Sequence, residues 1–363
     1  MRLAPLAVVS LLVSGGALAS QDIKIVGNIK QTIKAPQART LKAQPPKVIT
    51  LLKVNVSEKA RQTLVKRTAE TSKLAQHVPI PSYARHAQLG MNGVPVLNQG
   101  SHGTCATFAN TAAIDAALGK GDYISQLCQL QLGRHLENSA YMPSGWEGTT
   151  GQIVLNQMTI FGVVTKDQQR TNGCAGLNEY PMEGADPAAE MTLPEYHQIS
   201  EAIPQDKVAW SSILDVYQAS LERTNIIRAI NNIKAALQAG DRVTFGVLLV
   251  DFNVGVVGAI GQNVVANDTW ILTPEMAHDL QEGAELAGHE MVITGYDDDA
   301  VATDDHGRLH RGLFTLRNSW GEGIGDKGNF YMSYNYLNAL IIEAQRIRVL
   351  KSDDVDGPED IRS

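Results

Sequence analysis

The stretch from Val94 to Leu118, VPVLNQGSHGTCATFANTAAIDAAL, constrains the fold more than any other part of this sequence. Gly100 and Gly103 bracket a short polar loop, and most residues after Cys105 are small or apolar. A helix that is apolar on every side lies inside a protein, so the stretch predicts a buried central helix. Cys105 stands in its first turn, where unpaired backbone N–H groups and the helix dipole favour an anion. The position suits a thiolate, although a lone buried cysteine is more commonly structural.

The first twenty residues, MRLAPLAVVSLLVSGGALAS, have the features of a secretory signal peptide. Arg2 precedes an apolar run that is too short to span a bilayer, and an Ala-Leu-Ala site follows it. We expect a signal peptide over residues 1–19 with cleavage before Ser20. No later run is long and apolar enough for a membrane helix, so we expect a secreted protein, extracellular or periplasmic, with no membrane contact after cleavage.

Export would place the three cysteines in an oxidising compartment. Their odd number leaves at least one thiol unpaired within the chain. We expect a disulfide between Cys128 and Cys174 that leaves Cys105 free. The alternative is that both cysteines are reduced and buried.

Charge is distributed unevenly along the chain. Residues 20–78 carry 12 basic and 3 acidic side chains, a net charge of +9, whereas the chain from Pro79 onward has a net charge of −17. A basic segment commonly indicates a nucleic-acid or membrane partner. Here the same chain supplies an acidic partner, so we expect self-association and no nucleic-acid ligand.

Residues 20–78 predict a small unit of two strands and a helix. Alternating isoleucines indicate a half-buried strand over 22–34, with a bend at Gly27. A second strand is expected over 48–56 and a surface helix over 58–77. The second strand should bury one face, formed by Val48, Leu52, Val54 and Val56. Such a unit is too small to bury much core alone, so it should lean on the larger domain.

The remaining chain, 79–363, predicts an α+β domain of two halves. Helical patterns come first, and strand-like runs such as RVTFGVLLV, EMVITGYDD, GLFTLRNSW and NFYMSYNY follow the helix expected over 225–240. Helices first and antiparallel strands later are typical of α+β architecture.

A thiolate nucleophile needs a base, a group that orients the base, and donors for the oxyanion. His289 stands at the head of a strand, in GHEMVITGYDD. Asn318 could bind one imidazole nitrogen, and Trp320 could shield that bond from water. Gln99 can offer its side-chain N–H₂ group beside the backbone N–H of Cys105.

These motifs together resemble the papain-like cysteine peptidases. The resemblance rests on PVLNQGSHGTCATF, GHEMVITGY and RNSWGEGIGDKGNFY, whose key residues follow the family order Gln, Cys, His, Asn, Trp. It covers roughly residues 80–336, and IPSYARH at 80–86 is similar to the start of a mature enzyme of the family. The resemblance implies a helical half, whose central helix follows Cys105, and an antiparallel β half.

The resemblance also implies a function. Cys105 would attack the scissile carbonyl as the thiolate of an ion pair with His289, with Asn318 orienting the imidazole. Gln99 and the Cys105 N–H would hold the oxyanion. The residues expected to contact substrate are Trp320 and Gly148. We therefore expect a monomeric secreted cysteine endopeptidase, made as a zymogen, that acts on peptides or proteins without a metal or other cofactor; its side-chain preference stays open.

The sequence departs from the family pattern in several places. The nucleophile and the base are 184 residues apart, against roughly 130–150 in the family. The excess is expected in insertions at 185–222 and 253–285 and in an enlarged hairpin over DDDAVATDDHGRLHR. His102 replaces a disulfide cysteine and is expected to be exposed, and Glu290 replaces a small residue. A solvated turn is expected at Asp297, Asp298 and Asp299.

Two other functions share the same residue types. One is a Cys-His-Asn acyl transferase or deamidase-type effector, which lacks the NQGSxGxC loop. The other is an inactive, papain-shaped binding protein, which the presence of Cys105, His289 and Gln99 disfavours. We expect residues 20–78 to form a propeptide that covers the Cys105 cleft and is removed near Val78–Ile80. Charge should steer its docking, so that acid and salt weaken it.

Overall fold

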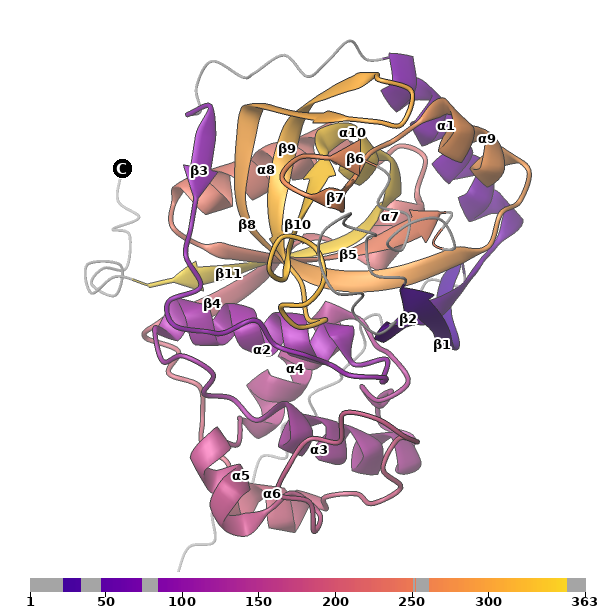
Figure 1. The fold of residues 1–363 in the computed structure, drawn as a ribbon. Helices are drawn as coiled ribbons and strands as arrows, with labels where there is room; N and C mark the ends of the chain where they lie inside the picture. Colours follow the sequence, from indigo (N-terminus) through magenta and orange to yellow (C-terminus); the bar gives the residue numbers. More distant parts are fainter. Residues whose placement is uncertain (1–21, 34–46, 74–83, 251, 253–260, 351–363) are drawn as a thin grey trace, which may run out of the picture.

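A computed structural model describes residues 22–33, 47–73, 84–250, 252 and 261–350. The expected signal peptide, the expected cleavage site near Val78–Ile80 and the first part of the expected 253–285 insertion lie outside these residues. The chain forms a helical half and a β half, which lie one below the other in Figure 1. The helical half contains α2 (Cys105–Leu118), α3 (Gln126–Asn138), α4 (Gly151–Phe161), α5 (Lys166–Asn172) and α6 (Leu193–Ile199). The expected mixed α+β class is confirmed.

The β half is built on one sheet. Its strands run in the order β4 (Val208–Leu214), β11 (Ile341–Val349), β5 (Arg242–Val250), β8 (Leu286–Thr303), β6 (Gly261–Gln262), β7 (Ala266–Trp270), β10 (Asn329–Ser333) and β9 (Leu309–Arg317). β8 also pairs with β9, and β3 (His86–Gln88) joins it on another edge. The helices of this half are α7 (Val216–Ser220), α8 (Ile226–Gln238), α9 (Pro274–Gln281) and α10 (Tyr334–Leu340).

The central helix α2 lies between the two halves, as its composition predicts. All residues from Cys105 to Ala116 are buried, and Ala109, Ala113 and Ile114 share a hydrophobic cluster with Val292 of β8 and Ile347 of β11. Small side chains let the helix approach the sheet closely. Because one end of α2 carries Cys105 and β8 carries His289, this packing fixes the distance between the two candidate catalytic groups.

The N-terminal segment, residues 20–78, forms the expected strand–strand–helix unit where it is described. Strands β1 (Ile23–Ile33) and β2 (Lys47–Val56) make an antiparallel hairpin, and helix α1 (Glu58–Lys73) follows. The register shifts between Ile25 and Gly27, whose φ of 141° favours glycine, so the expected bend is confirmed. Ser57 Oγ donates to Asp22 Oδ1 (2.7 Å) and accepts from the N–H of Ala60 (3.1 Å), which ties the hairpin to the start of α1.

The burial of β2 differs from the one-faced pattern expected. Val48 is 46% exposed, whereas Ile49, Thr50, Leu51, Leu52 and Val54 are all buried. Side chains from both faces of β2, including Ile49, Leu51, Leu52 and Val54, join the hydrophobic cluster of the β half, while its two edges pair with β1 and with β8. Period-two alternation predicts a half-buried strand and cannot reveal a strand held between other elements.

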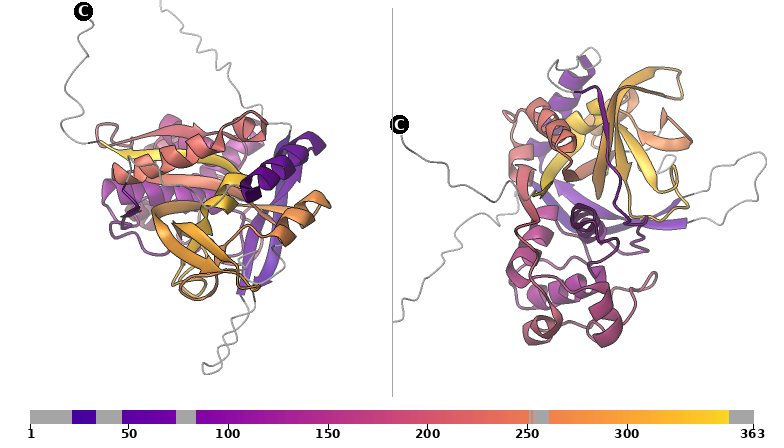
Figure 2. Two further views of the ribbon diagram at one scale, coloured as in Figure 1. Left: turned by 90° about the horizontal axis from the view of Figure 1, so that it is seen from above. Right: turned by 90° about the vertical axis from the view of Figure 1, so that its left-hand side faces the viewer.

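The regions expected to be insertions form much of the surface on which α1 packs. Figures 1 and 2 place α1 beside α9 and α10, and α1 also contacts α7. Arg67 donates to the carbonyl of Ala219 at the end of α7 (2.6 Å), and Arg61 donates to the carbonyl of Ala284 just after α9 (3.1 Å). Elements from both the 185–222 and 253–285 regions therefore hold the N-terminal segment.

The long hairpin of β8 and β9 is also present, with an irregularity between Asp297 and Val301. The expectation of a solvated turn at Asp297–Asp299 is wrong for Asp298, which is buried and accepts from Lys234 Nζ (2.6 Å) and Tyr334 OH (2.7 Å). The strand continues through these residues, so one of three consecutive aspartates must face inward.

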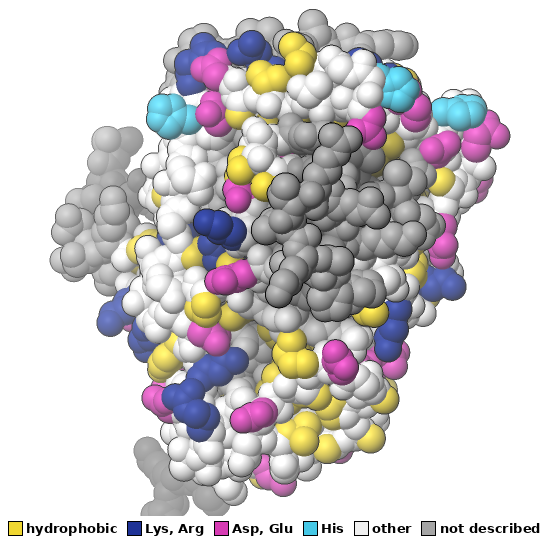
Figure 3. Space-filling view, in the orientation of Figure 1, with side chains coloured by type: hydrophobic (Ala, Val, Ile, Leu, Met, Phe, Trp, Pro, Cys, Tyr) yellow, Lys and Arg dark blue, Asp and Glu magenta, His cyan; other side chains and the backbone are white. Residues whose placement is uncertain are grey.

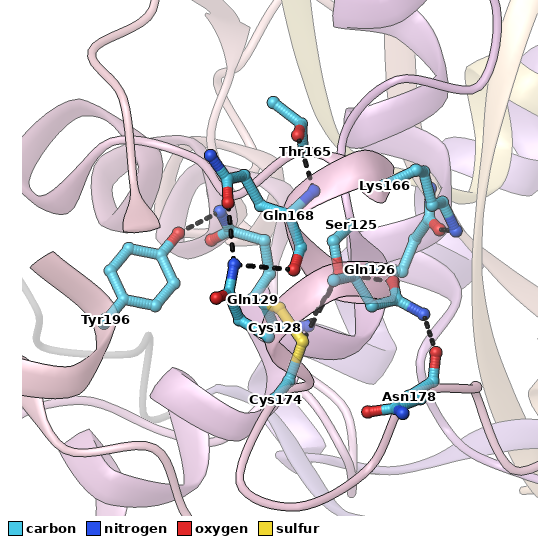
Figure 4. The surroundings of a disulfide bond; sticks show 12 residues. Ser125, Gln126, Cys128, Gln129, Thr165, Lys166, Gln168, Cys174, Asn178 and Tyr196 are labelled. Carbon is cyan, nitrogen blue, oxygen red and sulfur yellow. Dashed lines mark hydrogen bonds between the residues drawn. A yellow bond between two sulfur atoms is a disulfide. The ribbon is translucent and has the colours of Figure 1, made fainter. Parts of the chain in front are cut away.

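A disulfide joins Cys128 of α3 to Cys174, as expected, and leaves Cys105 as a buried free thiol. Figure 4 shows the polar groups that surround it. Ser125 caps α3 by accepting from the backbone N–H of Cys128 (2.9 Å), and its hydroxyl donates to Gln169 (2.7 Å). The bridge lies in a separate core of the helical half, which also contains Trp146 and Tyr196.

Candidate active site

Cys105 begins α2 and is completely buried. Its sulfur lies near the backbone N–H groups of Cys105 and Ala106 at the helix start and near that of Glu290 on β8. Glu290 directly follows His289, so the thiol lies against the strand that carries the candidate base. The structure thereby brings together two residues that the sequence separates by 184 positions.

His289 is held by Asn318 and Trp320. Its Nε2 lies 2.8 Å from Asn318 Oδ1, and its ring stacks on Trp320 with centroids 4.4 Å apart and planes 21° from parallel. Asn318 Oδ1 accepts the Nε2–H of this tautomer, which leaves Nδ1 as the basic nitrogen. Nδ1 is buried and has no hydrogen-bond partner among the described residues. The ring is thus oriented through one nitrogen and available through the other.

Gln99 is positioned by Ser319 and reaches the N-terminal segment. Its backbone N–H donates to the carbonyl of Ser319 (2.8 Å), and its Oε1 accepts from Ser319 Oγ (2.7 Å). These contacts turn Nε2 toward the carbonyls of His102 (2.9 Å) and Thr50 on β2 (3.4 Å). The side-chain donor therefore faces a peptide carbonyl of another segment. Sequence reasoning missed Ser319, whose place beside Asn318 was the available signal.

Strand β2 occupies the space in front of these residues. Besides the contact of Thr50 with Gln99, Leu52 packs so closely on Gly148 and Gly288 that a side chain at either glycine would collide with Leu52 or its neighbours. Asn28 of β1 packs in the same way against Gly103 in the nucleophile loop. Gly148, expected to contact substrate, thus contacts the hairpin.

Burial keeps both candidate catalytic groups neutral in this state. Desolvation, with a smaller effect of Glu290, raises the pKa of the Cys105 thiol to about 12. Desolvation lowers the pKa of His289 to about 4, which the bond to Asn318 opposes. An ion pair of thiolate and imidazolium is therefore unfavourable while β2 excludes water from the site.

His102 differs from its expected exposure. It is buried, its Nδ1 lies 2.5 Å from Asp186 Oδ1, and its ring makes edge contacts with Trp146 and Tyr180. The Tyr180 hydroxyl donates to the carbonyl of Gln99 (2.9 Å). Side-chain packing here links the nucleophile loop to a distant segment, the task that a disulfide would otherwise perform. Sequence reasoning missed Tyr180, because no local pattern distinguishes it.

The described residues contain no cluster of His, Cys, Asp and Glu suited to hold a metal ion. Within the same residues, no helix combines the length and apolar character needed to cross a membrane. The arrangement at Cys105 offers the groups that nucleophilic catalysis uses: a thiol, an oriented imidazole and an amide donor.

Comparison with known protein families gives a match in the C-terminal part of the chain. A sequence model of the Peptidase C1-like family matches residues 217–352, which include His289, Asn318 and Trp320. A search of curated proteins finds no match.

The solved structures that resemble the chain are distant from it. Xylellain, a cysteine protease from Xylella fastidiosa, is 19% identical, with a TM-score of 0.47 over 76% of this chain and 91% of that one. Digestive procathepsin L 3 of Tenebrio molitor is 15% identical, with a TM-score of 0.43 over 78% of both chains. The bromelain protease of Ananas comosus, in complex with the E64 inhibitor, is 15% identical, with a TM-score of 0.42 over 72% and 97%.

The family match covers β5 to β11 and includes His289 and its partners, whereas Cys105 and Gln99 lie outside it. The expected resemblance is confirmed in this part of the chain, where residues 217–352 match the Peptidase C1-like family.

Proposed function

We propose that this protein is an exported cysteine endopeptidase, made as a latent zymogen whose N-terminal segment closes the site. The observation that carries the proposal is that Cys105 lies against β8 beside His289, that Asn318 binds the imidazole, and that Gln99 directs its Nε2 to the carbonyls of His102 and Thr50. A thiol, an oriented imidazole and an amide donor are the groups that acyl transfer to a cysteine needs.

In the open enzyme, water reaches the site and reduces the desolvation that now opposes charge separation. Cys105 then transfers its proton to His289 and attacks the substrate carbonyl. Gln99 Nε2 and the Cys105 N–H stabilise the oxyanion, while the imidazolium protonates the leaving amine. His289 next takes a proton from water, which hydrolyses the thioester and restores the thiol. Asn318 keeps the imidazole in the required orientation throughout.

The proposed latency depends on the contacts that hold the N-terminal segment against the β half. Ile49, Leu51 and Leu64 belong to the same hydrophobic cluster as the β half. Among the described residues, one ion pair, between Lys66 and Glu222, links the segment to the rest of the chain, and both side chains are more than half exposed. Figure 3 shows acidic and basic side chains interspersed on the visible face. Docking therefore depends on apolar burial and on bonds to carbonyls more than on the charge asymmetry that the sequence suggested.

The test compares the full-length chain with the form trimmed near Val78–Ile80, using a fluorogenic peptide library. The trimmed form should hydrolyse peptides, and the full-length form should do so far more slowly. Cys105→Ala should abolish hydrolysis and His289→Ala should nearly do so, whereas Asn318→Ala should be milder because asparagine orients the base without reacting. Hydrolysis by Cys105→Ala at the wild-type rate would refute the mechanism, and a full-length chain as active as the trimmed one would refute latency.

A further inference from the structure

Two buried carboxyl groups lie between the halves and take no part in the proposed chemistry. Glu290, on β8, and Glu343, on β11, are 2% and 3% exposed. Among the described residues, no lysine, arginine or histidine forms an ion pair with either one. Burying two carboxylates without a cation is strongly unfavourable, so the pair needs a proton or donors from the surrounding elements.

Glu290 joins the strand of the base to the helix of the nucleophile. Its Oε1 accepts from Asn110 Nδ2 (2.6 Å). Asn110 lies on α2, five residues after Cys105, and its Oδ1 accepts from Thr244 Oγ1 of β5 (2.9 Å). One amide side chain thereby links α2 to two neighbouring strands. A change at Glu290 would act directly on the packing of β8 against α2.

Glu343 occupies the N-terminus of α4. Its Oε1 accepts from the N–H of Gly151 (3.0 Å), and its Oε2 accepts from the N–H of Gln152 (3.4 Å). The Gly151 N–H also faces Glu290, and a side chain at Gly151 would collide with Oε1 of that residue. The two carboxyl groups thus meet at one backbone donor, which cannot satisfy both as carboxylates.

Within the part of the chain that the structure describes, no positively charged group faces the pair. Glu290 faces the Cys105 thiol and Asn110 on α2, Gly151 on α4 and Glu343 on β11. Glu343 faces Gln345 of its own strand and experiences Asp215 before α7. Burial and mutual repulsion raise the pKa of Glu290 well above 4.5, and burial raises that of Glu343 to about 7.

We propose that Glu290 and Glu343 share one proton and act as positioning residues, holding the strand of His289 against the helix of Cys105. The inference rests on the proposed peptidase function. When the shared proton is lost at alkaline pH, two carboxylates repel each other across the Gly151 N–H. The same event places a full negative charge beside Cys105, which disfavours its thiolate. Both effects lower activity on the alkaline side of the pH profile.

The test uses Glu290→Gln and Glu343→Gln, because either amide keeps the acceptor and cannot lose the proton. Each variant is processed from the full-length chain with an added protease, and kcat/KM is measured across pH together with the rate at which iodoacetamide alkylates Cys105. We expect both variants to extend the alkaline limb by about one pH unit or more, a tenfold gain in kcat/KM on that side. Glu290→Ala should lower kcat more than it changes KM, and Glu290→Gln should restore kcat.

Asp115→Asn is the matched control. Asp115 is a buried acid of α2, the helix that begins with Cys105, and burial raises its pKa to about 7. It accepts from the N–H groups of Tyr123 and Ile124, far from the thiol. It should leave the alkaline limb unchanged. The proposal is overturned if the alkaline limb of the kcat/KM profile is unchanged in both amide variants, if it shifts in Glu290→Gln alone, or if it shifts equally in the control. Absence of hydrolysis in the wild type would instead refute the peptidase function, while the alkylation profile would still report on the pair.

Discussion

Replacing Leu64 with alanine should open the latent form without altering the site itself. Leu64 lies on α1, is 1% exposed, and packs in the cluster that α1 shares with the β half. A buried leucine-to-alanine change costs about 2–5 kcal/mol. Leu64 is buried only while α1 packs on the β half, so we assign about 3 kcal/mol of this cost to the free energy that holds the N-terminal segment in place. At about 1.4 kcal/mol per factor of ten, the open fraction should rise about 100-fold.

Alkylation of Cys105 in the full-length chain measures that open fraction. Cys105 is buried and is the free thiol of the structure, so reagent reaches it only when the segment leaves. His289→Ala serves as the parent for all variants, since it prevents self-processing during the assay. Leu64→Ala should then react about 100-fold faster than the parent, at a rate below that of the trimmed protein. Lys59→Ala, at an exposed position of the same helix, is the matched control and should react at the parent rate.

Equal alkylation rates in the parent and in Leu64→Ala would refute the view that the packing of α1 on the β half keeps the site closed. Salt gives a second criterion. Because the segment is held by apolar burial and by arginine bonds to carbonyls, raising the ionic strength should change the rate only slightly. A rise at high salt that matches the effect of Leu64→Ala would mean that the charge asymmetry, +9 against −17, governs docking after all.

Three further predictions concern the site and its support. Gln99→Ala should lower kcat of the trimmed enzyme by about 10²–10³ with little change in KM, because its amide acts on the oxyanion; an unchanged kcat would exclude that role. Thiol counting in denaturant should find one free thiol, and reduction of the Cys128–Cys174 bridge, which closes a separation of 46 residues, should cost about 4 kcal/mol in unfolding experiments; three free thiols would rule out the bridge. Glu290→Gln should raise the melting temperature at neutral pH and not at pH 4. The pKa of Glu290 is higher in the folded than in the unfolded wild type, so as pH rises above 4.5 the unfolded state ionises first and the folded wild type loses stability. A difference in melting temperature between variant and wild type that stays constant with pH would contradict this.

Much of the candidate site could be predicted from local sequence. Cys105 at the start of a buried helix, His289 at the head of a strand and Asn318 beside Trp320 are each signalled by their immediate neighbours. The mixed α+β class followed from helical and strand patterns, and the bend at Gly27 followed from one glycine in an alternating run. These features depend on contacts within a few residues, which a sequence displays directly.

The tertiary structure decided the features that depend on distant contacts. Alternation placed Val48 inside, yet Val48 is exposed, and packing in the cluster of the β half buries Ile49 and Leu51 on the other face as well. The loop position of His102 suggested exposure, but Asp186 and Tyr180 enclose it from another segment.

Net charge predicts that charge steers the docking of the N-terminal segment, but it could not reveal the contacts that hold the segment, in which Arg61 and Arg67 donate to main-chain carbonyls. The proximity of Glu290 to Glu343, 53 positions later, is likewise a product of strand order, which brings β8 and β11 to opposite edges of β5 and both side chains to the start of α4. A sequence specifies such groups one by one, and only packing determines which of them must share a proton.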